Sequence, residues 1–156
     1  MITLKDCMRA ISAALEEEFG AAPITKDIWE GFERPATFLQ PVDISTAMEG
    51  VVRHDEYRFE IIRFSQDDDK GYIDLLSYQE RLRQLLAKPI RVTGRFALFP
   101  EDVDYEIIMS DYALVAAFDI DNYQVDEDAA SGTGPAMLVL YENDECLVPL
   151  GAEPGN

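Results

Sequence analysis

Histidine and cysteine are scarce in this chain of 156 residues, which excludes most kinds of catalytic site and of transition-metal site. His54 is the only histidine, and Cys7 and Cys146 are the two cysteines. No G-x-S-x-G element accompanies His54, which we interpret as a surface histidine rather than a general base. Cys7 falls among apolar residues, where a thiol packs as a small hydrophobe. We therefore expect no catalytic, cofactor-binding or metal-ligating residues, and free thiols in a reduced cytoplasm.

Long apolar runs are also missing. The longest stretch, residues 113–118, has the length of a strand, far below the roughly 18 residues that a membrane span needs. Lys5 and Asp6 interrupt the amino-terminal residues, so a secretory signal is not expected. The sequence predicts no contact with a membrane.

Positive charge is in short supply. The chain has 31 acidic and 13 basic residues, a formal net charge of −18. Such a surface repels nucleic acid and anionic lipid. Eight arginines lie between positions 34 and 95, whereas residues 101–156 contain no lysine or arginine. This segregation is typical of a solvated acidic face, or of head-to-tail pairing between a basic patch and a neighbour's acidic patch, which can close a ring.

Two segments repeat apolar residues at helical spacing. Residues 3–18 are predicted to form a helix that Thr3 caps together with Asp6, and that Gly20 ends. A second helix is predicted from about Tyr72 to Ala87. Its apolar stripe consists of Tyr72, Leu75, Leu76, Gln79, Leu82 and Leu86.

Strand patterns account for most of the remainder. They cover residues 24–30, 36–44, 51–64, 90–98, 103–109, 112–123 and 137–141, with a turn at 45–50. Pro41 indicates an edge strand or a bulge. The predicted fold is α+β, a mixed and mostly antiparallel sheet with two helices on one face. We predict one domain over 1–125, an acidic Gly-rich loop over 126–136, a strand within 137–148 and a disordered tail over 149–156.

Three acidic or Gly-rich stretches fail the motifs that they superficially resemble. Counting an EF-hand loop from Asp119 places Gln124 at the glycine position and Ala130 at the glutamate position. The three acids at 67–69 indicate a solvated loop, and weak opportunistic calcium binding is the alternative. The Gly-rich residues 131–134 lack the lysine and helix of a phosphate loop. Carboxylate pairs of the glycosidase kind meet by chance among so many acids, and nothing singles one out.

The order of elements, with a few anchor residues, resembles the phage tail terminator family. The run DIWEGFERPATFL at 27–39 resembles its first hairpin, in which a Gly-aromatic step precedes a proline and an aromatic-rich strand. Residues 57–64 resemble the next strand, which leads through a polar loop into the second helix. Residues 111–123 resemble the final hairpin strand, with Leu114, Phe118 and Asp121 in the expected places. The resemblance covers about residues 3–125.

The resemblance implies a non-enzymatic structural protein of phage assembly. It would form in the host bacterial cytoplasm, from a phage or prophage, and belong to a virion or tail-like particle. Its partners would be copies of itself in a homohexameric ring, the tail tube protein and a neck or head-completion protein. DNA would pass through the bore without specific binding, because acidic walls repel phosphate.

Other functions remain as alternatives. A head–tail connector or tail completion protein shares a related fold. A small-ligand or calcium-binding α+β protein would need an enclosed apolar pocket, and a hydrolase would need a buried carboxylate pair. The segment at 47–52 places apolar groups beside a predicted turn, so we predict oligomer contacts at Met48, Val51 and Val52.

Overall fold

The structure, a computed structural model, describes residues 1–26 and 28–125. The loop, strand and tail predicted over 126–156 lie outside the described residues. The described part of the chain folds into two compact units. The larger contains Ile2–Ser45 and Glu56–Asp121, and the smaller contains Met1, Thr46–Asp55 and residues 122–125.

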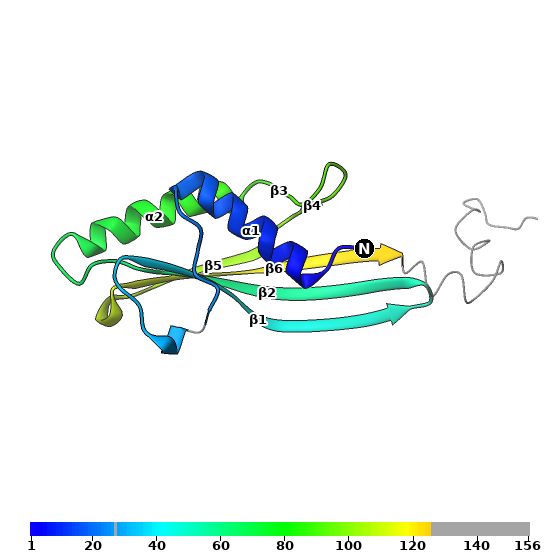
Figure 1. Cartoon of the computed structure of the whole chain (residues 1–156), viewed down its shortest axis with the longest axis horizontal. Coiled ribbons are helices and arrows are strands. Elements are labelled where there is room, and N and C mark those ends of the chain that lie inside the picture. Colours follow the sequence, from blue (N-terminus) through cyan, green and yellow to red (C-terminus); the bar gives the residue numbers. More distant parts are fainter. Residues whose placement is uncertain (27, 126–156) are drawn as a thin grey trace, which may run out of the picture. The chain divides into compact units, whose positions relative to one another are not determined.

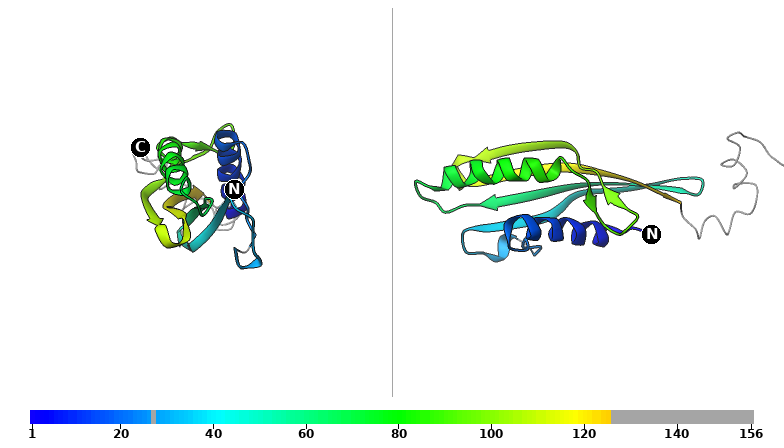
Figure 2. Two further views of the ribbon diagram at one scale, coloured as in Figure 1. Left: turned by 90° about the vertical axis from the view of Figure 1, so that its left-hand side faces the viewer. Right: turned by 90° about the horizontal axis from the view of Figure 1, so that it is seen from above.

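The larger unit is built on a four-stranded antiparallel sheet in the order β1-β2-β6-β5. Helices α1 and α2 cover one face of it (Figures 1 and 2). This arrangement confirms the α+β class. The bounds are α1 (Leu4–Phe19), β1 (Ala36–Glu49), β2 (Val52–Phe64), α2 (Gly71–Leu86), β3 (Ile90–Arg91), β4 (Ala97–Leu98), β5 (Glu101–Ile108) and β6 (Ala113–Val125).

The main core lies between the helices and the sheet. Strand alternation predicts which side chains enter it, because successive residues of a strand point to opposite faces. The inward-facing residues of β2 and β6 are buried as predicted, with exposed fractions of 4% or less. They are Tyr57, Phe59 and Ile61 on β2, and Leu114, Ala116, Phe118 and Ile120 on β6.

Helix α1 begins and ends as its sequence predicts. The Thr3 hydroxyl accepts a hydrogen bond from the Asp6 amide at 3.2 Å, and the Asp6 carboxylate accepts one from the Thr3 amide at 2.9 Å. This reciprocal pair satisfies two amides that a helix start leaves without partners. Gly20 ends the helix with a φ of 85°, in the left-handed region that glycine adopts without steric cost. Cys7 is fully buried, which confirms its packing role.

The predicted stripe of α2 is wrong at two positions. Tyr72 and Leu76 are 41% and 40% exposed, whereas Tyr78, absent from the predicted stripe, is buried. The Tyr78 ring stacks on Phe19 of α1 with centroids 4.0 Å apart. Because α2 packs against α1 as well as against the sheet, its buried face is rotated from the one that apolar periodicity indicates.

Several strand boundaries also differ from the prediction. The strand predicted over 24–30 is wrong for the described residues of that range: Ile24 forms a single parallel bridge with Phe38, and η1 (Ile28–Glu30) is a short 3₁₀ helix. Residues 90–98 form the two short strands of the β3–β4 hairpin rather than one strand. Strand β1 continues to Glu49, so the predicted turn at 45–50 reduces to Gly50 and Val51.

Strand β1 lies at an edge of the sheet, as Pro41 predicts. Gln40 bonds Glu60, and Ser45 bonds Glu56. Glu56 and Glu60 are four positions apart and lie on the same face of β2, so their partners Gln40 and Ser45 lie on one face of β1. In a regular strand, residues on one face are separated by an even number of positions, whereas Gln40 and Ser45 are five positions apart. The alternation of β1 is therefore broken near Pro41, as happens at a bulge.

The segment that resembles the terminator hairpin covers part of the outer face, opposite the helices. Phe32 packs edge-on against Phe38, with ring centroids 5.0 Å apart. Arg34 lies over the Phe64 ring and donates to the carbonyl oxygens of Ser65, at 2.9 Å, and of Asp111. Phe32 and Phe64 pack against Ala36, Phe38 and Ile62, which form a second, smaller core.

The smaller unit contains a buried ion pair. Asp55 is fully buried and accepts hydrogen bonds from Arg53 at 2.8 Å and from the Thr46 hydroxyl at 2.7 Å. His54 is half-buried rather than on the surface, because its ring stacks on Tyr123 at a centroid distance of 4.0 Å.

Candidate functional site

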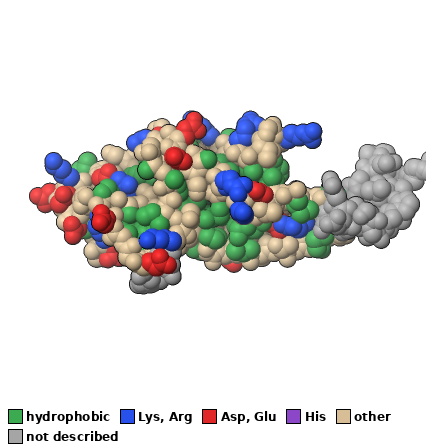
Figure 3. Space-filling model, in the orientation of Figure 1, with side chains coloured by type: hydrophobic (Ala, Val, Ile, Leu, Met, Phe, Trp, Pro, Cys, Tyr) green, Lys and Arg blue, Asp and Glu red, His purple; other side chains and the backbone are tan. Residues whose placement is uncertain are grey.

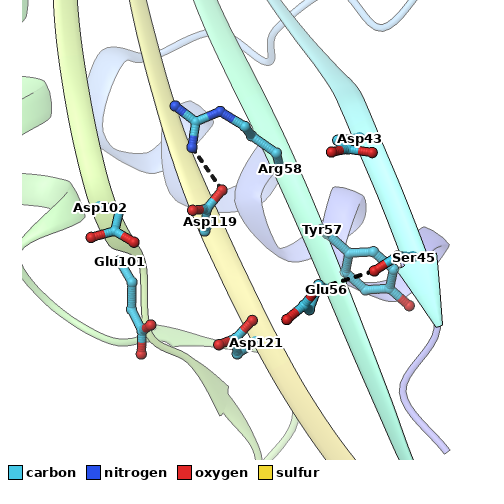
Figure 4. Close-up of a pocket in the computed structure, with 9 residues that line it drawn as sticks. All are labelled: Asp43, Ser45, Glu56, Tyr57, Arg58, Glu101, Asp102, Asp119 and Asp121. Carbon is cyan, nitrogen blue, oxygen red and sulfur yellow. Dashed lines mark hydrogen bonds and ion pairs between the residues drawn. The ribbon is translucent and has the colours of Figure 1, made fainter. Parts of the chain in front are cut away.

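An acidic groove of about 380 Å³ lies on the outer face of the sheet, in the larger unit (Figure 4). All four strands of the sheet contribute side chains to it. Its lining contains six carboxylates and one guanidinium, that of Arg58. The lining residues are Asp43, Ser45, Glu56, Tyr57, Arg58, Glu101, Asp102, Asp119 and Asp121.

Alternation along the two central strands explains why acids gather here. On β2, Glu56 and Arg58 alternate with side chains that are buried beneath the helices. On β6, Asp119 and Asp121 alternate in the same way with Phe118 and Ile120. The polar half of each pattern is therefore directed away from the core, onto the face where the groove lies.

Strand β5 adds two more acids through an irregular start. Glu101 pairs with Asp119, and the next paired residue of β5, Asp104, pairs with Ala117, so β5 holds one extra residue at this point. Asp102 lies within this bulge and has a φ of 49°. Opposed like charges such as Glu101 and Asp119 destabilise a strand pair. The groove therefore concentrates negative charge at some cost to the sheet.

Arg58 partly neutralises the groove. Its guanidinium donates to Asp119 at 2.7 Å and to Asp104 at 3.3 Å. The hydrogen bond to Asp119 raises the pKa of Arg58 above its ordinary value, and Asp104 adds to the effect. Since the guanidinium carries its charge at any ordinary pH, its role is to hold β2, β6 and β5 together across the groove.

Within the described residues, Asp43, Glu101 and Asp102 form no ion pair, and all three are exposed. A groove with this excess of carboxylates attracts guanidinium and ammonium groups and repels phosphate. It is not an apolar small-molecule pocket, and its exposed acids lack the apolar surroundings that a glycosidase acid needs.

The residues singled out as oligomer contacts lie in the smaller unit. Met48 is 48% exposed on β1 and Val52 is half-buried at the start of β2, so both offer apolar surface. Val51 is 1% exposed, so its side chain offers almost none. The acids at 67–69 are exposed in the loop before α2, where the Asp68 carboxylate accepts a hydrogen bond from the Lys70 amide at 3.0 Å.

The groove was not predicted from sequence. Four strands supply its acids, and their proximity depends on strand order and register. The only local signal was the polar alternation of Glu56 and Arg58, and of Asp119 and Asp121. None of the described helices is both long and apolar enough to cross a membrane.

Comparison with known proteins shows that most of the chain matches one protein family. The family model described as phage tail terminator protein matches residues 6–132. The match includes nearly all of α1 and every strand of the four-stranded sheet. No match was found among curated proteins.

Proposed function

We propose a function for this chain from the fact that it belongs to the phage tail terminator protein family. The chain caps the tail tube as a homohexameric ring, stops polymerisation of the tube protein and presents a surface to the neck or head-completion protein. The observation that carries the proposal is the family match over 6–132, which includes nearly all of α1, the whole of α2 and the whole four-stranded sheet. The protein assembles in the host bacterial cytoplasm and remains in a virion or tail-like particle.

The role is structural. The family is one of tail components, which implies a non-enzymatic role. The charge of the chain also suits the proposed ring. Six copies, each with a formal charge of −18, carry −108, so DNA in the bore meets repulsion rather than the counterion-releasing contacts that produce affinity.

Exposed apolar surface in the smaller unit supports a contribution to the ring contact. Met48 and Val52 offer part of it, beside the exposed Met1, Tyr123 and Val125 of the same unit. Met48→Asp would place a charge in that contact and weaken assembly. Ile73→Asp, which places the same charge at an exposed apolar residue of α2 outside the smaller unit, serves as a control. If Met48→Asp assembles like wild type, Met48 is not at the contact.

The test is light scattering after size exclusion at low and high concentration, with and without purified tail tubes, combined with a tube-growth assay. We expect a mass near six chains, in solution or on the tubes, and arrest of tube growth on addition of the protein. A monomer that ignores tube ends would overturn the proposal. Binding to the head-side component without binding to tubes would instead assign the chain to the head–tail connectors. A structure of the ring with a bore lined by arginine would contradict the DNA argument.

A further inference from the structure

The cations of this chain are distributed unevenly along the sequence. Residues 81–100 contain five lysines and arginines and no acid, whereas residues 101–125 contain seven acids and no cation. The structure places the two stretches on different surfaces of the larger unit. The first includes the β3–β4 hairpin, and the second supplies much of the acidic groove.

Three exposed cations lie on the hairpin or just before its first strand: Lys88, Arg91 and Arg95. None of the three forms an ion pair with another described residue. The ion pairs of the described residues employ other cations, namely Arg9, Lys26, Arg53, Arg58, Arg63, Arg81 and Arg83. Lys5, Arg34 and Lys70 also form no ion pair with a described residue, but they are scattered along the sequence, whereas these three lie within eight positions. Figure 3 shows Lys and Arg side chains projecting over the region of the hairpin.

The hairpin is held firmly in place. Ile90 and Leu98 are buried in the main core, and the Val92 amide donates to the Phe96 carbonyl at 2.8 Å across the turn. The Arg91 guanidinium donates to the Gly94 carbonyl at 3.2 Å. Because the backbone of the hairpin is already ordered, a partner that binds these cations loses little free energy in ordering it.

The hairpin and the groove lie on opposite sides of the larger unit. The hairpin packs beside α1 in the helical layer, whereas the groove is on the face of the sheet away from the helices (Figures 1 and 4). Within the described residues of one copy, none of the three cations forms an ion pair with a groove carboxylate. Two complementary surfaces that face in opposite directions are suited to head-to-tail contacts between copies, which close into a ring when the rotation permits.

We propose that the β3–β4 hairpin of one copy docks through Lys88, Arg91 and Arg95 into the acidic groove of the next copy around the ring. The guanidinium groups donate to groove carboxylates that have no cation of their own chain, Asp43, Glu101 and Asp102. The two surfaces are opposite in charge, since three cations meet a lining of six carboxylates and one guanidinium. This inference rests on the proposed ring and identifies the surfaces that form it.

A charge exchange tests the contact. The hairpin variant Arg91→Glu/Arg95→Glu gives the hairpin a formal charge of −1. The groove variant Asp43→Lys/Glu101→Lys/Asp121→Lys changes the groove lining from −5 to +1. Each variant alone would associate at least about tenfold more weakly than wild type, because like charges then face each other. An equimolar mixture would recover assembly, since a six-membered ring accommodates the two variants in alternation.

The control is Lys5→Glu/Lys70→Glu, which reverses two exposed cations outside the hairpin and has the same net charge as the hairpin variant. It should assemble like wild type. Far-ultraviolet circular dichroism establishes that each variant is folded. If the groove variant is not folded, Arg95→Cys/Glu101→Cys in a Cys146→Ser background replaces it, and oxidation should give an interchain ladder that ends at six.

The outcomes separate the two proposals. A wild-type chain that stays monomeric with and without tubes overturns the proposed function. A wild-type ring whose assembly is affected equally by the hairpin variant and the control, with no recovery in the mixture, overturns the docking proposal alone. Weakening confined to the hairpin and groove variants, with recovery on mixing, supports it.

Discussion

Gly71 is the position where adding one methyl group should most clearly destabilise the protein. It is the first residue of α2, and a Cβ there would lie 2.1 Å from the Gln66 carbonyl oxygen. The same Cβ would lie 2.9 Å from the Tyr112 ring and 3.0 Å from the Ser65 hydroxyl. The main obstacle is a backbone carbonyl rather than the end of a flexible side chain. Gly71→Ala therefore requires the backbone to move.

Two effects of opposite sign decide the magnitude. Alanine in place of glycine favours a helix by up to about 1 kcal/mol. Inserting a methyl group into a filled site costs about 1–3 kcal/mol. The backbone around Gln66 resists movement, because its side chain donates to the Arg34 carbonyl at 3.0 Å and the Ser65 amide donates to the Tyr112 carbonyl at 3.0 Å. We expect Gly71→Ala to lower the free energy of unfolding by about 1–2 kcal/mol.

Gly94→Ala is the matched control. No heavy atom lies within 4 Å of a Cβ built at Gly94, and its φ is outside the left-handed region. This variant should be neutral, or stabilising by up to about 1 kcal/mol through the unfolded state. Urea unfolding followed by circular dichroism gives both values from the shift in midpoint at constant m. If Gly71→Ala is as stable as Gly94→Ala, the close approach at Gly71 does not control stability and the reasoning is refuted.

Three further predictions address α2, α1 and the groove. Leu75→Ala should lower the free energy of unfolding by about 2–5 kcal/mol, because Leu75 is fully buried. Ile73→Ala, at a residue that is 62% exposed, should change it by no more than about 0.5 kcal/mol. Equal losses in urea unfolding would contradict the observed face of α2. The hydrogen bond from the Thr3 amide holds the pKa of Asp6 below its ordinary value of 3.8. The free energy of unfolding of wild type should therefore exceed that of Asp6→Asn in full above pH 3.8, and the excess should be lost as the pH falls through the folded pKa. A stability difference that stays constant between pH 6 and pH 2 would refute this. Arg58→Gln should lower the melting temperature at low salt, because the carboxylates that Arg58 bridges then repel one another. The decrease should be much smaller at about 1 M NaCl, which screens this repulsion. A decrease that is independent of salt would mean that the packing of Arg58 dominates.

Local patterns were sufficient for several elements. The cap at Thr3 and Asp6 involves residues three positions apart, and the buried face of β6 follows from its own alternation. The family was also predicted, from the order of the elements and a few anchor residues, and the match over 6–132 confirms it. Each of these features depends on neighbours in sequence or on order along the chain, which the amino-acid sequence contains directly.

Errors arose where a distant segment determines the local structure. Residues 24–30 have apolar side chains at strand-like positions, but the one described bridge is between Ile24 and Phe38, and Ile24 and Ile28 pack against the smaller core. The face of α2 depends on the stacking of Phe19 on Tyr78, which no helical periodicity can indicate.

The sequence by itself determined the α+β class, the capped first helix, the buried faces of the central strands and the surplus of acid, because each depends on local periodicity or on composition. Tertiary structure alone decided that acids from four strands meet in one groove and that the unpaired cations of the β3–β4 hairpin lie on the opposite side. Strand order and register bring residues such as Asp43 and Asp119 together across 76 positions of sequence. Those pairings follow from the packing of the whole sheet against its helices, which no short stretch of the chain encodes.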